Sequence, residues 1–455
     1  MAFGLTHRVA TLAAVLLALL ACNGPRAKRA SDALPTSKKL AARSFDSGFS
    51  LSHGTFNGML CASDGKIYYV LCSDSIDTGA QMYSYEPATD KIRHLGDLTE
   101  ASGEKGLKTI PQGKSHVNFV EANGKLYFAT HVGYYTIRDG RETMGVPPPG
   151  YKPYPGGHFL AYDMASGKFE SLAAAPAGQG ILSMNMDTKR GRLYGLTWPS
   201  GYFLRYDLET RSLKNLGPVS KEGENGNGPA YRVLCRSLAV DPEDGSVYFT
   251  TSDGDILRYQ YDHDAIETVQ AEDLRKDYFG VWDPSKPGHM GYNWRQTVWY
   301  APEKAIYAIH GNSGYLFRFD PRAARVNVLD RITSEPSKRS GMYDQFSYGY
   351  LSFTLGPDGR TLYYLTGGPV SENGGRRAGN EKATAGARGQ EDLRLVTYEI
   401  PTGSYTDHGA VFFSDGQKPS LVNSIAVAKD GSVYSLAGVA QNGHVRVDLF
   451  RIQVK

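Results

Sequence analysis

Histidines are the side chains of this 455-residue sequence whose types and positions point most directly to chemistry. An imidazole exchanges protons near neutral pH and is a common transition-metal ligand. His116, His131 and His310 lie far apart along the chain, so only the fold can bring them together. We predict that His116 and His131 serve as a general base and its partner. A divalent metal held by such histidines is an alternative, although no local His-x-His spacing indicates one.

Arginines, tyrosines and amides accompany these histidines near the expected ends of strands, where carboxylates are few. Arginine binds carboxylate or sulfate through two parallel hydrogen bonds, and a tyrosine can protonate a leaving oxygen. We predict that Arg232 or Arg236 neutralises a carboxylate and that Tyr202 is the acid. Further groups are expected to bind substrate: Trp198, Asn293, Arg295, His310, Asn312, Tyr315 and Tyr348. These residue types predict a site for an anionic, hydroxyl-rich ligand.

Several other chemistries lack their sequence motifs. The chain has no Gly-x-Ser-x-Gly, no His-Glu-x-x-His, no P-loop and no Cys-x-x-Cys, which would indicate serine hydrolases, zinc proteases, nucleotide binding or redox pairs. No pair of carboxylates stands out as the acid and base of a glycoside hydrolase. Asp253, Asp255, Asp283 and Asp344 keep that alternative open.

The elements that must position these residues repeat along the chain. A turn is followed by a strand ending on aromatics, then by a strand such as Leu204-Arg205-Tyr206-Asp207 and a polar turn. The tyrosines that mark the repeats stand roughly 60 residues apart; they are Tyr68, Tyr127, Tyr194, Tyr248, Tyr307, Tyr363 and Tyr434. Repeats of this length with four short strands are typical of propeller blades. We therefore predict an all-β fold, a seven-bladed β-propeller with four-stranded blades, spanning residues 45–455.

Ring closure and the face of the propeller follow from the ends and insertions of the repeats. The last repeat holds about three strands, and residues 45–51 are a spare β-like stretch, so this N-terminal strand is expected to close the ring. The long connections should open on one face, where long loops usually carry binding sites. They are residues 133–157, 217–231, 271–292, 331–348 and 367–391. Most histidines map near that face, whereas His263 lies in a turn on the other.

The N-terminus resembles a bacterial lipoprotein signal. A twelve-residue apolar run is too short to span a bilayer and ends in Leu19-Leu20-Ala21-Cys22, similar to a lipobox in which the cysteine is lipidated. We expect a signal peptide over residues 1–22 and a flexible tether over residues 23–44. An ordinary secretory signal is the alternative. The expected location is the cell envelope, lipid-anchored in the periplasm or at the outer membrane.

Composition limits the partners. A net charge of +3 without a basic stripe gives no reason to expect nucleic acid, and we expect a monomer that touches the membrane only through its anchor. Apart from Cys22, the three cysteines Cys61, Cys72 and Cys235 are an odd number for an exported protein, and no disulfide is predicted.

The predicted architecture and the residue types at its mouth resemble the seven-bladed polysaccharide lyases of the oligogalacturonate and ulvan lyase type. The resemblance covers the repeat region as architecture and residue types, without a motif that aligns residue by residue. It implies proton abstraction at C5 of a uronate and loss of the O4-linked sugar, so that an anionic polysaccharide or oligosaccharide would be the substrate.

Two other functions remain open. The stretch from Ser237 to Thr250 is similar to strictosidine-synthase and gluconolactonase propellers, which implies a calcium-dependent lactonase-like hydrolase, although no acidic calcium-ligand set can be assembled from this sequence. A non-catalytic surface propeller that holds a glycan or a protein on the same face is the second alternative.

Overall fold

The structure is a computed structural model that describes residues 38–138, 141–335, 338, 352–367, 393–420, 422–441 and 444–454. These residues belong to one compact unit, Lys38–Lys455. Cys22 and Tyr348 lie outside the described residues, as does the predicted signal peptide.

The described part of the chain is almost entirely β-structure, in antiparallel four-stranded sheets that follow one another in chain order. The first sheet contains β2 (Met59–Cys61), β3 (Ile67–Leu71), β4 (Gln81–Glu86) and β5 (Lys91–Asp97). The second contains β6 (Val120–Ala122), β7 (Lys125–Ala129), β10 (His158–Asp163) and β11 (Phe169–Ala174). The third contains β12 (Gly180–Asp187), β13 (Arg192–Trp198), β14 (Tyr202–Asp207) and β15 (Ser212–Pro218).

Two further sheets repeat the same order. The fourth contains β16 (Ala239–Val240), β17 (Val247–Thr250), β18 (Asp255–Gln260) and β19 (Ala265–Asp273). The fifth contains β20 (Trp294–Tyr300), β21 (Ala305–His310), β22 (Tyr315–Asp320) and β23 (Arg325–Arg331). A separate hairpin, β8 (Tyr135–Arg138) and β9 (Arg141–Met144), stands in the long connection between β7 and β10. The helical elements are short: α1 (Leu98–Ala101), η1 (Gly223–Asn225), η2 (Gly228–Ala230), η3 (Asp277–Phe279) and η4 (Ala301–Glu303).

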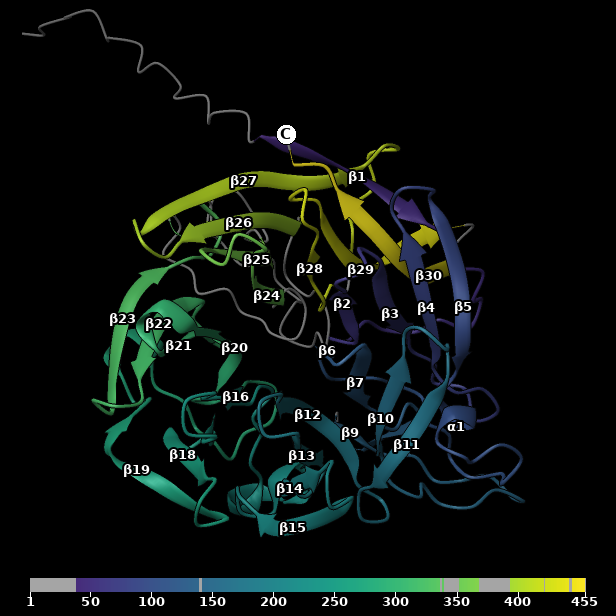
Figure 1. Ribbon diagram of the computed structural model, residues 1–455, viewed down its shortest axis with the longest axis horizontal. Coiled ribbons are helices and arrows are strands. Elements are labelled where there is room, and N and C mark those ends of the chain that lie inside the picture. Colours follow the sequence, from purple (N-terminus) through teal and green to yellow (C-terminus); the bar gives the residue numbers. More distant parts are fainter. Residues whose placement is uncertain are drawn as a thin grey trace, which may run out of the picture. The chain divides into compact units, whose positions relative to one another are not determined.

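The remaining strands form one eight-stranded sheet that includes the start of the described chain. Its order is β24 (Ser352–Leu355), β25 (Thr361–Gly367), β26 (Leu393–Glu399), β27 (Ser404–Phe413), β1 (Lys39–Phe45), β30 (His444–Ile452), β29 (Val433–Gln441) and β28 (Ala426–Val427). Strand β1 runs parallel to β27 and antiparallel to β30 (Figure 1). The β1 side of this sheet therefore depends on residues from both ends of the described chain.

An aromatic residue followed by Asp, Tyr-Asp or Phe-Asp, works as a turn signal between the third and fourth strands of a sheet. Asp163, Asp207 and Asp320 each accept hydrogen bonds from the backbone N–H groups two and three residues further on, at 2.8–3.1 Å. A carboxylate used in this way fixes a tight turn. The same phrase therefore gives the same hairpin in three different sheets.

The repeated aromatics join each sheet to the next. Rings meet between the first and second sheets (Tyr68 and Tyr162, centroids 6.0 Å apart) and between the third and fourth (Tyr194 and Tyr259, 5.2 Å). The sheets follow one another around a common centre in Figure 1, with β12, β16 and β20 toward it. These observations confirm the expected propeller-like, repeat-based all-β architecture.

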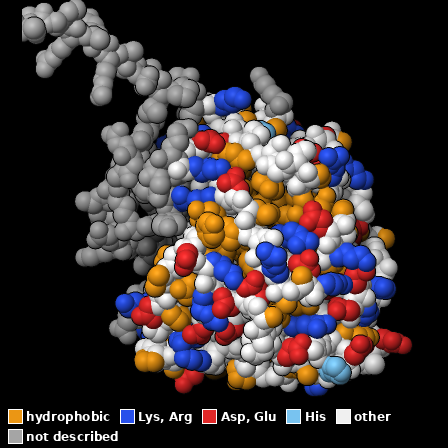
Figure 2. Space-filling view, turned by 90° about the vertical axis from the view of Figure 1, so that its left-hand side faces the viewer, with side chains coloured by type: hydrophobic (Ala, Val, Ile, Leu, Met, Phe, Trp, Pro, Cys, Tyr) orange, Lys and Arg blue, Asp and Glu red, His pale blue; other side chains and the backbone are white. Residues whose placement is uncertain are grey.

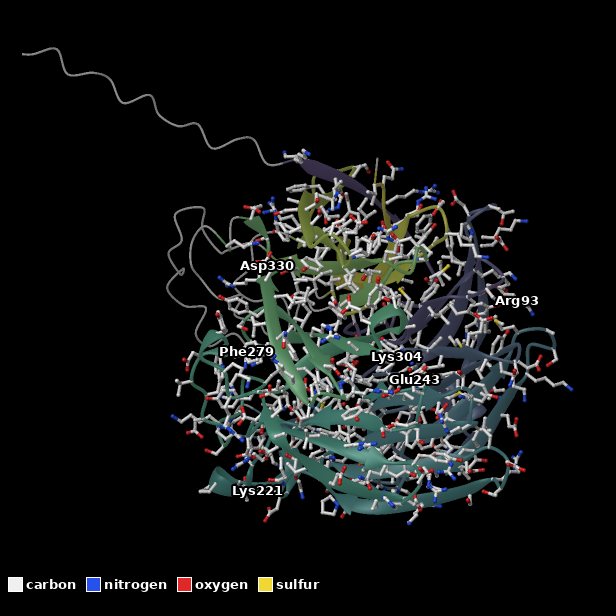
Figure 3. All side chains as sticks on the ribbon, turned by 60° about the vertical axis from the view of Figure 1, so that its left-hand side comes forward. Arg93, Lys221, Glu243, Phe279, Lys304 and Asp330 are labelled. Atoms are coloured by element: carbon white, nitrogen blue, oxygen red, sulfur yellow. The ribbon has the colours of Figure 1, made fainter. Side chains whose placement is uncertain are left out.

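Polar contacts also cross between sheets. Lys304, which follows η4, reaches Glu243 of the fourth sheet's first turn, with Nζ 2.8 Å from Oε2; both are labelled in Figure 3. Both side chains are exposed, so the pair stabilises the fold only slightly. Basic and acidic groups are interspersed over the face drawn in Figure 2.

The N-terminal strand lies earlier in the chain than predicted. It spans residues 39–45 rather than 45–51, and it therefore occupies part of the segment expected to be a tether over residues 23–44. Only Ala42 and Phe45 of this strand are buried, at 6% exposure each. Leu40 is half-buried against the same cluster as Ala42, and the remaining lysine, arginine and small side chains are exposed, which is why the composition resembles that of a tether.

The described cysteines Cys61, Cys72 and Cys235 are free thiols. Within the described ranges, no helix has both the length and the apolar character needed to cross a membrane.

Candidate functional site

Backbone pairing brings the first elements of the candidate site together. Lys114 and His131 face each other across an isolated antiparallel bridge, and the N–H of each donates to the carbonyl of the other at 2.9 and 2.8 Å. Lys114 precedes β6 and His131 follows β7, so the bridge continues this hairpin past its regular strands. The bridge requires glycines nearby, because a Cβ on Gly133 would lie 2.0 Å from the Ser73 carbonyl oxygen.

Lys114 is a buried cation, only 5% exposed. Its Nζ lies 4.1 Å from the ring centroid of Phe56 and 4.0 Å from that of Tyr135. Among the described residues, no carboxylate comes within ion-pair distance of it; Glu142 and Asp74 act on it only from further away. Burial lowers the pKa of Lys114. Two aromatic faces replace part of the lost hydration, but within the described ranges the ammonium has no oxygen acceptor.

His131 offers a buried lone pair. It is 2% exposed, and its Nδ1 lies 3.0 Å from the Val132 carbonyl oxygen. A carbonyl can only accept, so Nδ1 carries the proton and Nε2 carries the lone pair. Nε2 is buried without a hydrogen-bond partner in the described part of the chain. Burial, together with the charge of Lys114, lowers the pKa of His131 to about 3, so the ring is neutral at pH 7.

A glycine makes room for the His131 ring. A Cβ added at Gly180, the first residue of β12, would lie 2.9 Å from both Cγ and Cδ2 of His131. That separation is below normal contact, so any larger side chain there would displace the imidazole. The third sheet therefore fixes the position of a histidine carried by the second.

His116 lies beside His131 with the same tautomer. The two ring centroids are 5.7 Å apart, and His116 Nδ1 lies 2.9 Å from the Leu182 carbonyl oxygen. Burial lowers the pKa of His116 well below its usual value, and the neighbouring His131, Arg236, Arg295 and Lys114 lower it further. The cationic groups therefore surround two imidazoles that stay neutral.

Tyr135 and Trp198 form an aromatic wall around His131. The Tyr135 hydroxyl lies 3.1 Å from His131 Nδ1 and donates to the Val132 carbonyl at 2.8 Å. The Trp198 ring centroid is 5.4 Å from that of His131 and 5.6 Å from that of Tyr135. Burial raises the pKa of Tyr135 well above its usual value, so its hydroxyl keeps its proton.

Glu224 holds Trp198 and Arg236 in place. Its Oε2 accepts from Trp198 Nε1 at 3.0 Å, and its Oε1 accepts from the Leu234 N–H at 3.0 Å and lies 2.6 Å from Arg236 NH2. Arg236 also donates to the Leu234 carbonyl at 2.8 Å. The guanidinium is 7% exposed, and its charge lowers the pKa of both histidines. One carboxylate thus orients an aromatic ring and a cation at the same site.

The structure brings together five of the residues that the sequence indicated. His116, His131, Trp198 and Arg236 share the contacts described above, and Arg295 acts electrostatically on His116. Arg295 is itself 3% exposed.

Arg232 and Tyr202 lie in other surroundings. Arg232 Nε is 2.6 Å from Asp253 Oδ2, and its NH1 donates to the carbonyls of Pro229 and Tyr231 at 2.9 and 2.6 Å, so its charge is already paired. Tyr202 is partly buried and packs against the hydrophobic cluster that contains β14 residues such as Leu204. Within the described chain, Tyr202 makes no hydrogen bond or ring contact with His116 or His131.

The two predicted amides support backbone. Asn293 donates through Nδ2 to the carbonyls of Val233 and Met290 at 3.0 and 3.1 Å. Asn312 donates to the Gly291 carbonyl at 2.7 Å and accepts from the Met290 N–H at 3.1 Å. Both are buried, and these bonds explain why the sequence has amides there without any ligand.

His310 and Tyr315 belong to a second aromatic cluster around η3. The His310 ring stacks on Phe279, with centroids 4.2 Å apart and planes 6° from parallel; Phe279 is labelled in Figure 3. Burial lowers the pKa of His310 to about 3. Tyr315 meets the exposed Tyr278 at 5.7 Å in an edge-on contact.

The described residues include no group of three or more His, Cys, Asp or Glu side chains placed to hold a metal ion. The rings of His116 and His131 are neighbours, whereas His310 stacks on Phe279 and hydrogen-bonds to Ser313. The metal alternative therefore gains no ligand set from these positions.

Three residues of the site were not predicted: Lys114, Tyr135 and Glu224. A signal existed for two of them, since Lys114 stands two residues before His116 and Tyr135 lies in the long connection that follows His131. Glu224 also lies in a long connection, but nothing in the sequence pairs it with Trp198 or Arg236.

No protein-family model matches this sequence, and no curated protein matches it either. A chain from a crystal structure of the Mitotic Checkpoint Complex aligns with a TM-score of 0.48 and 11% identity, over 95% of this chain and 98% of that chain. A Bacteroides uniformis protein named as a candidate 6-phosphogluconolactonase aligns with a TM-score of 0.43 and 12% identity, over 81% of this chain and 94% of that chain. Neither likeness bears on the activity of this chain.

Proposed function

We propose that the site around Lys114 and His131 binds the carboxylate of a uronate-containing polysaccharide or oligosaccharide and cleaves it by β-elimination. One observation carries the proposal: a buried ammonium that has no carboxylate within ion-pair distance among the described residues stands beside a buried imidazole lone pair that has no hydrogen-bond partner among them. A bound anion would give the Lys114 ammonium a charge partner, and the His131 lone pair could accept an acidic proton.

The chemistry needs three groups, and the site supplies a candidate for each. Lys114 would hold the uronate carboxylate, and the charge of Arg236, which Glu224 already pairs, would add to the attraction from nearby. Both charges would make the C5 proton more acidic. His131 Nε2 would take that proton, with His116 as its partner. The C5–H electron pair would form the C4–C5 double bond while the C4–O4 bond breaks.

The leaving oxygen needs a proton, and the structure favours a different tyrosine from the one that the sequence indicated. Tyr135 keeps its proton and its hydroxyl lies 3.1 Å from His131 Nδ1, whereas Tyr202 packs in a hydrophobic cluster. We therefore propose Tyr135 as the acid that protonates O4. Trp198 would support a sugar ring through its aromatic face.

The proposal is tested by incubating the purified full chain with uronate polymers and following the ultraviolet absorbance of the unsaturated product. His131→Gln should reduce turnover by roughly 10²- to 10⁴-fold, the usual contribution of an acid–base group. His263→Gln is the matched control, because His263 is exposed in a turn, where it contacts Gln260, and it should keep full activity.

Two results would count against the lyase. Unchanged turnover in His131→Gln with normal folding would remove the assigned base. Binding of uronate oligosaccharides without any cleavage would support the alternative of a non-catalytic glycan-binding propeller that uses the same charges. The calcium-dependent lactonase-like hydrolase stays a prediction, and the described residues offer no group of carboxylates placed to bind calcium.

We also propose the finer architecture and the location. The eight-stranded sheet consists of two four-stranded halves joined at β27 and β1, so the protein would have seven blades. Strand β1 would be the fourth strand of the last blade, and packing of Tyr85 on Tyr434, with centroids 5.8 Å apart, supports closure between the first and last sheets. Lipidation at Cys22 would anchor a monomeric protein in the cell envelope.

A further inference from the structure

A second set of reactive groups lies on the second sheet, away from the contacts of Lys114. Ser171 of β11, His158 at the start of β10 and Glu104 in the loop after α1 are hydrogen-bonded in a line. His158 Nδ1 lies 2.8 Å from Ser171 Oγ, and His158 Nε2 lies 2.8 Å from Glu104 Oε1. A hydroxyl, an imidazole and a carboxylate in this order are the groups of a serine nucleophile with its base and orienting acid.

The hydrogen bonds fix the direction of proton transfer. An ionised carboxylate can only accept, so the neutral His158 ring carries its proton on Nε2 and donates it to Glu104. Nδ1 then holds the lone pair and accepts the Ser171 hydroxyl proton. The ring nitrogens are exchanged relative to the chymotrypsin arrangement, but the role of each group is the same.

The carboxylate is rigidly held from the interior. Gln112 Nε2 donates to both oxygens of Glu104 at 3.1 Å, and the Gln112 side-chain carbonyl accepts from Thr130 Oγ1 at 2.7 Å and from the Tyr154 hydroxyl at 2.6 Å. Gln112 is fully buried, and the side chains of Glu104 and His158 are 6% and 12% exposed. Such a fixed acid keeps the imidazole in one orientation.

Ser171 is placed where a substrate can reach it. It is exposed, on the outermost strand of its sheet. The pairing of β10 with β11 shifts next to it, from Phe159 with Ala173 to Leu160 with Ser171, so Leu172 is an extra residue in a bulge. Bulges re-aim side chains beside reactive sites, and an edge strand has free N–H groups of the kind that stabilise an oxyanion.

We propose that Ser171, His158 and Glu104 form a second, independent site that hydrolyses carboxylic esters. Ser171 Oγ attacks the ester carbonyl while its proton passes to His158 Nδ1. The C–O bond to the alcohol breaks, and the imidazolium returns the proton to the departing oxygen. Water, activated by the same nitrogen, then releases the acid and regenerates the serine.

The test is covalent labelling of the purified full chain with a fluorophosphonate probe, followed by peptide mapping. Ser171 should be the modified residue, and Ser171→Ala should abolish labelling at that peptide. Ser166→Ala is the matched control, since Ser166 is also exposed but its Oγ donates to Asp163 at 2.9 Å and has no histidine. It should label like the natural chain. His158→Gln should slow labelling by roughly 10²- to 10⁴-fold.

Glu104 acts through His158 and is a positioning residue. Glu104→Gln keeps the shape but removes the charge that favours protonated imidazole, so the pH at half-maximal labelling should move down as the rate falls. A purely structural role would lower the rate without moving that pH and would overturn the assignment of Glu104. Absence of Ser171 labelling in the folded natural chain would overturn the whole proposal. A failure to cleave uronate polymers would not contradict the esterase proposal, because the two sites share no assigned residue.

Discussion

Replacing Lys114 by methionine separates a ligand-binding role of this cation from a structural one. Methionine has nearly the length of lysine and also packs well on aromatic rings, for roughly 0.3–1.5 kcal/mol. The substitution loses two cation–π contacts of about 0.5–2 kcal/mol each. It also removes the cost of burying an ammonium that, among the described residues, has no carboxylate within ion-pair distance. That cost amounts to several kcal/mol. We therefore expect Lys114→Met to leave the free energy of unfolding unchanged or to raise it.

Ligand binding should respond in the opposite direction. A charge-assisted hydrogen bond to a carboxylate contributes roughly 1.5–3 kcal/mol, so the dissociation constant of a uronate oligosaccharide should rise by about 10- to 100-fold. Isothermal titration calorimetry measures the binding and urea unfolding measures the stability. The control is Lys125→Met, because Lys125 is partly exposed, 3.4 Å from Glu170 and outside the site.

The same variant has a spectroscopic signature. The charge of Lys114 is among the causes that lower the pKa values of His131 and His116. Removing it should raise both pKa values, which NMR titration of the imidazoles would detect. An unchanged dissociation constant together with a stability loss above about 2 kcal/mol would mean that Lys114 is a structural residue, and the reasoning would be refuted.

Further outcomes are expected from acidification, from glycine substitution and from the N-terminus. His131 has a pKa of about 3 in the folded protein and about 6.5 when unfolded, so the unfolded chain binds more protons between these values. The free energy of unfolding should therefore fall by up to about 1.4 kcal/mol per pH unit as the pH drops below 6.5. Urea unfolding at several pH values measures this. Gly180→Ala should displace the His131 ring and reduce uronate turnover at least tenfold while the fold survives, as activity and circular dichroism would show. Deleting residues 39–45 should lower the free energy of unfolding by about 3–5 kcal/mol through loss of the buried Phe45 and of pairing on both sides, whereas an unchanged melting temperature would contradict the proposed closure. Mass spectrometry of the membrane fraction should find an acylated N-terminal Cys22, and a mature chain that starts elsewhere would exclude the anchor.

The repeat could be predicted because its signals are local. Asp207 and its equivalents form their turns with N–H groups two and three residues away, and the periodic tyrosines pack on the adjacent sheet. Strand β1 was harder to place, since an outer strand buries few side chains. Here only Ala42 and Phe45 are buried, and Lys39 and Arg43 give the segment the composition of a tether.

The site could be predicted only in part, because residue type does not reveal what a side chain contacts. Asn293 and Asn312 have the chemistry of ligand binders, yet backbone carbonyls use their Nδ2 donors. Arg232 is paired with Asp253, and no local sequence pattern links these two residues. Lys114 could not be predicted because a lysine is usually solvated, and its burial depends on the rings of Phe56 and Tyr135, which only the fold brings to it.

The electrostatics of the proposed site imply that anion binding and protonation are coupled. Burial is the main cause of the low pKa of His131, and the charges of Lys114 and Arg236 lower that pKa further. A bound carboxylate would offset these two charges and raise the pKa of His131. At pH values near or below that raised pKa, the complex would hold more protons than the free protein, so binding should tighten as the pH falls. The same shift would make His131 a stronger base in the complex than in the free protein, and therefore better suited to take a proton from the bound anion.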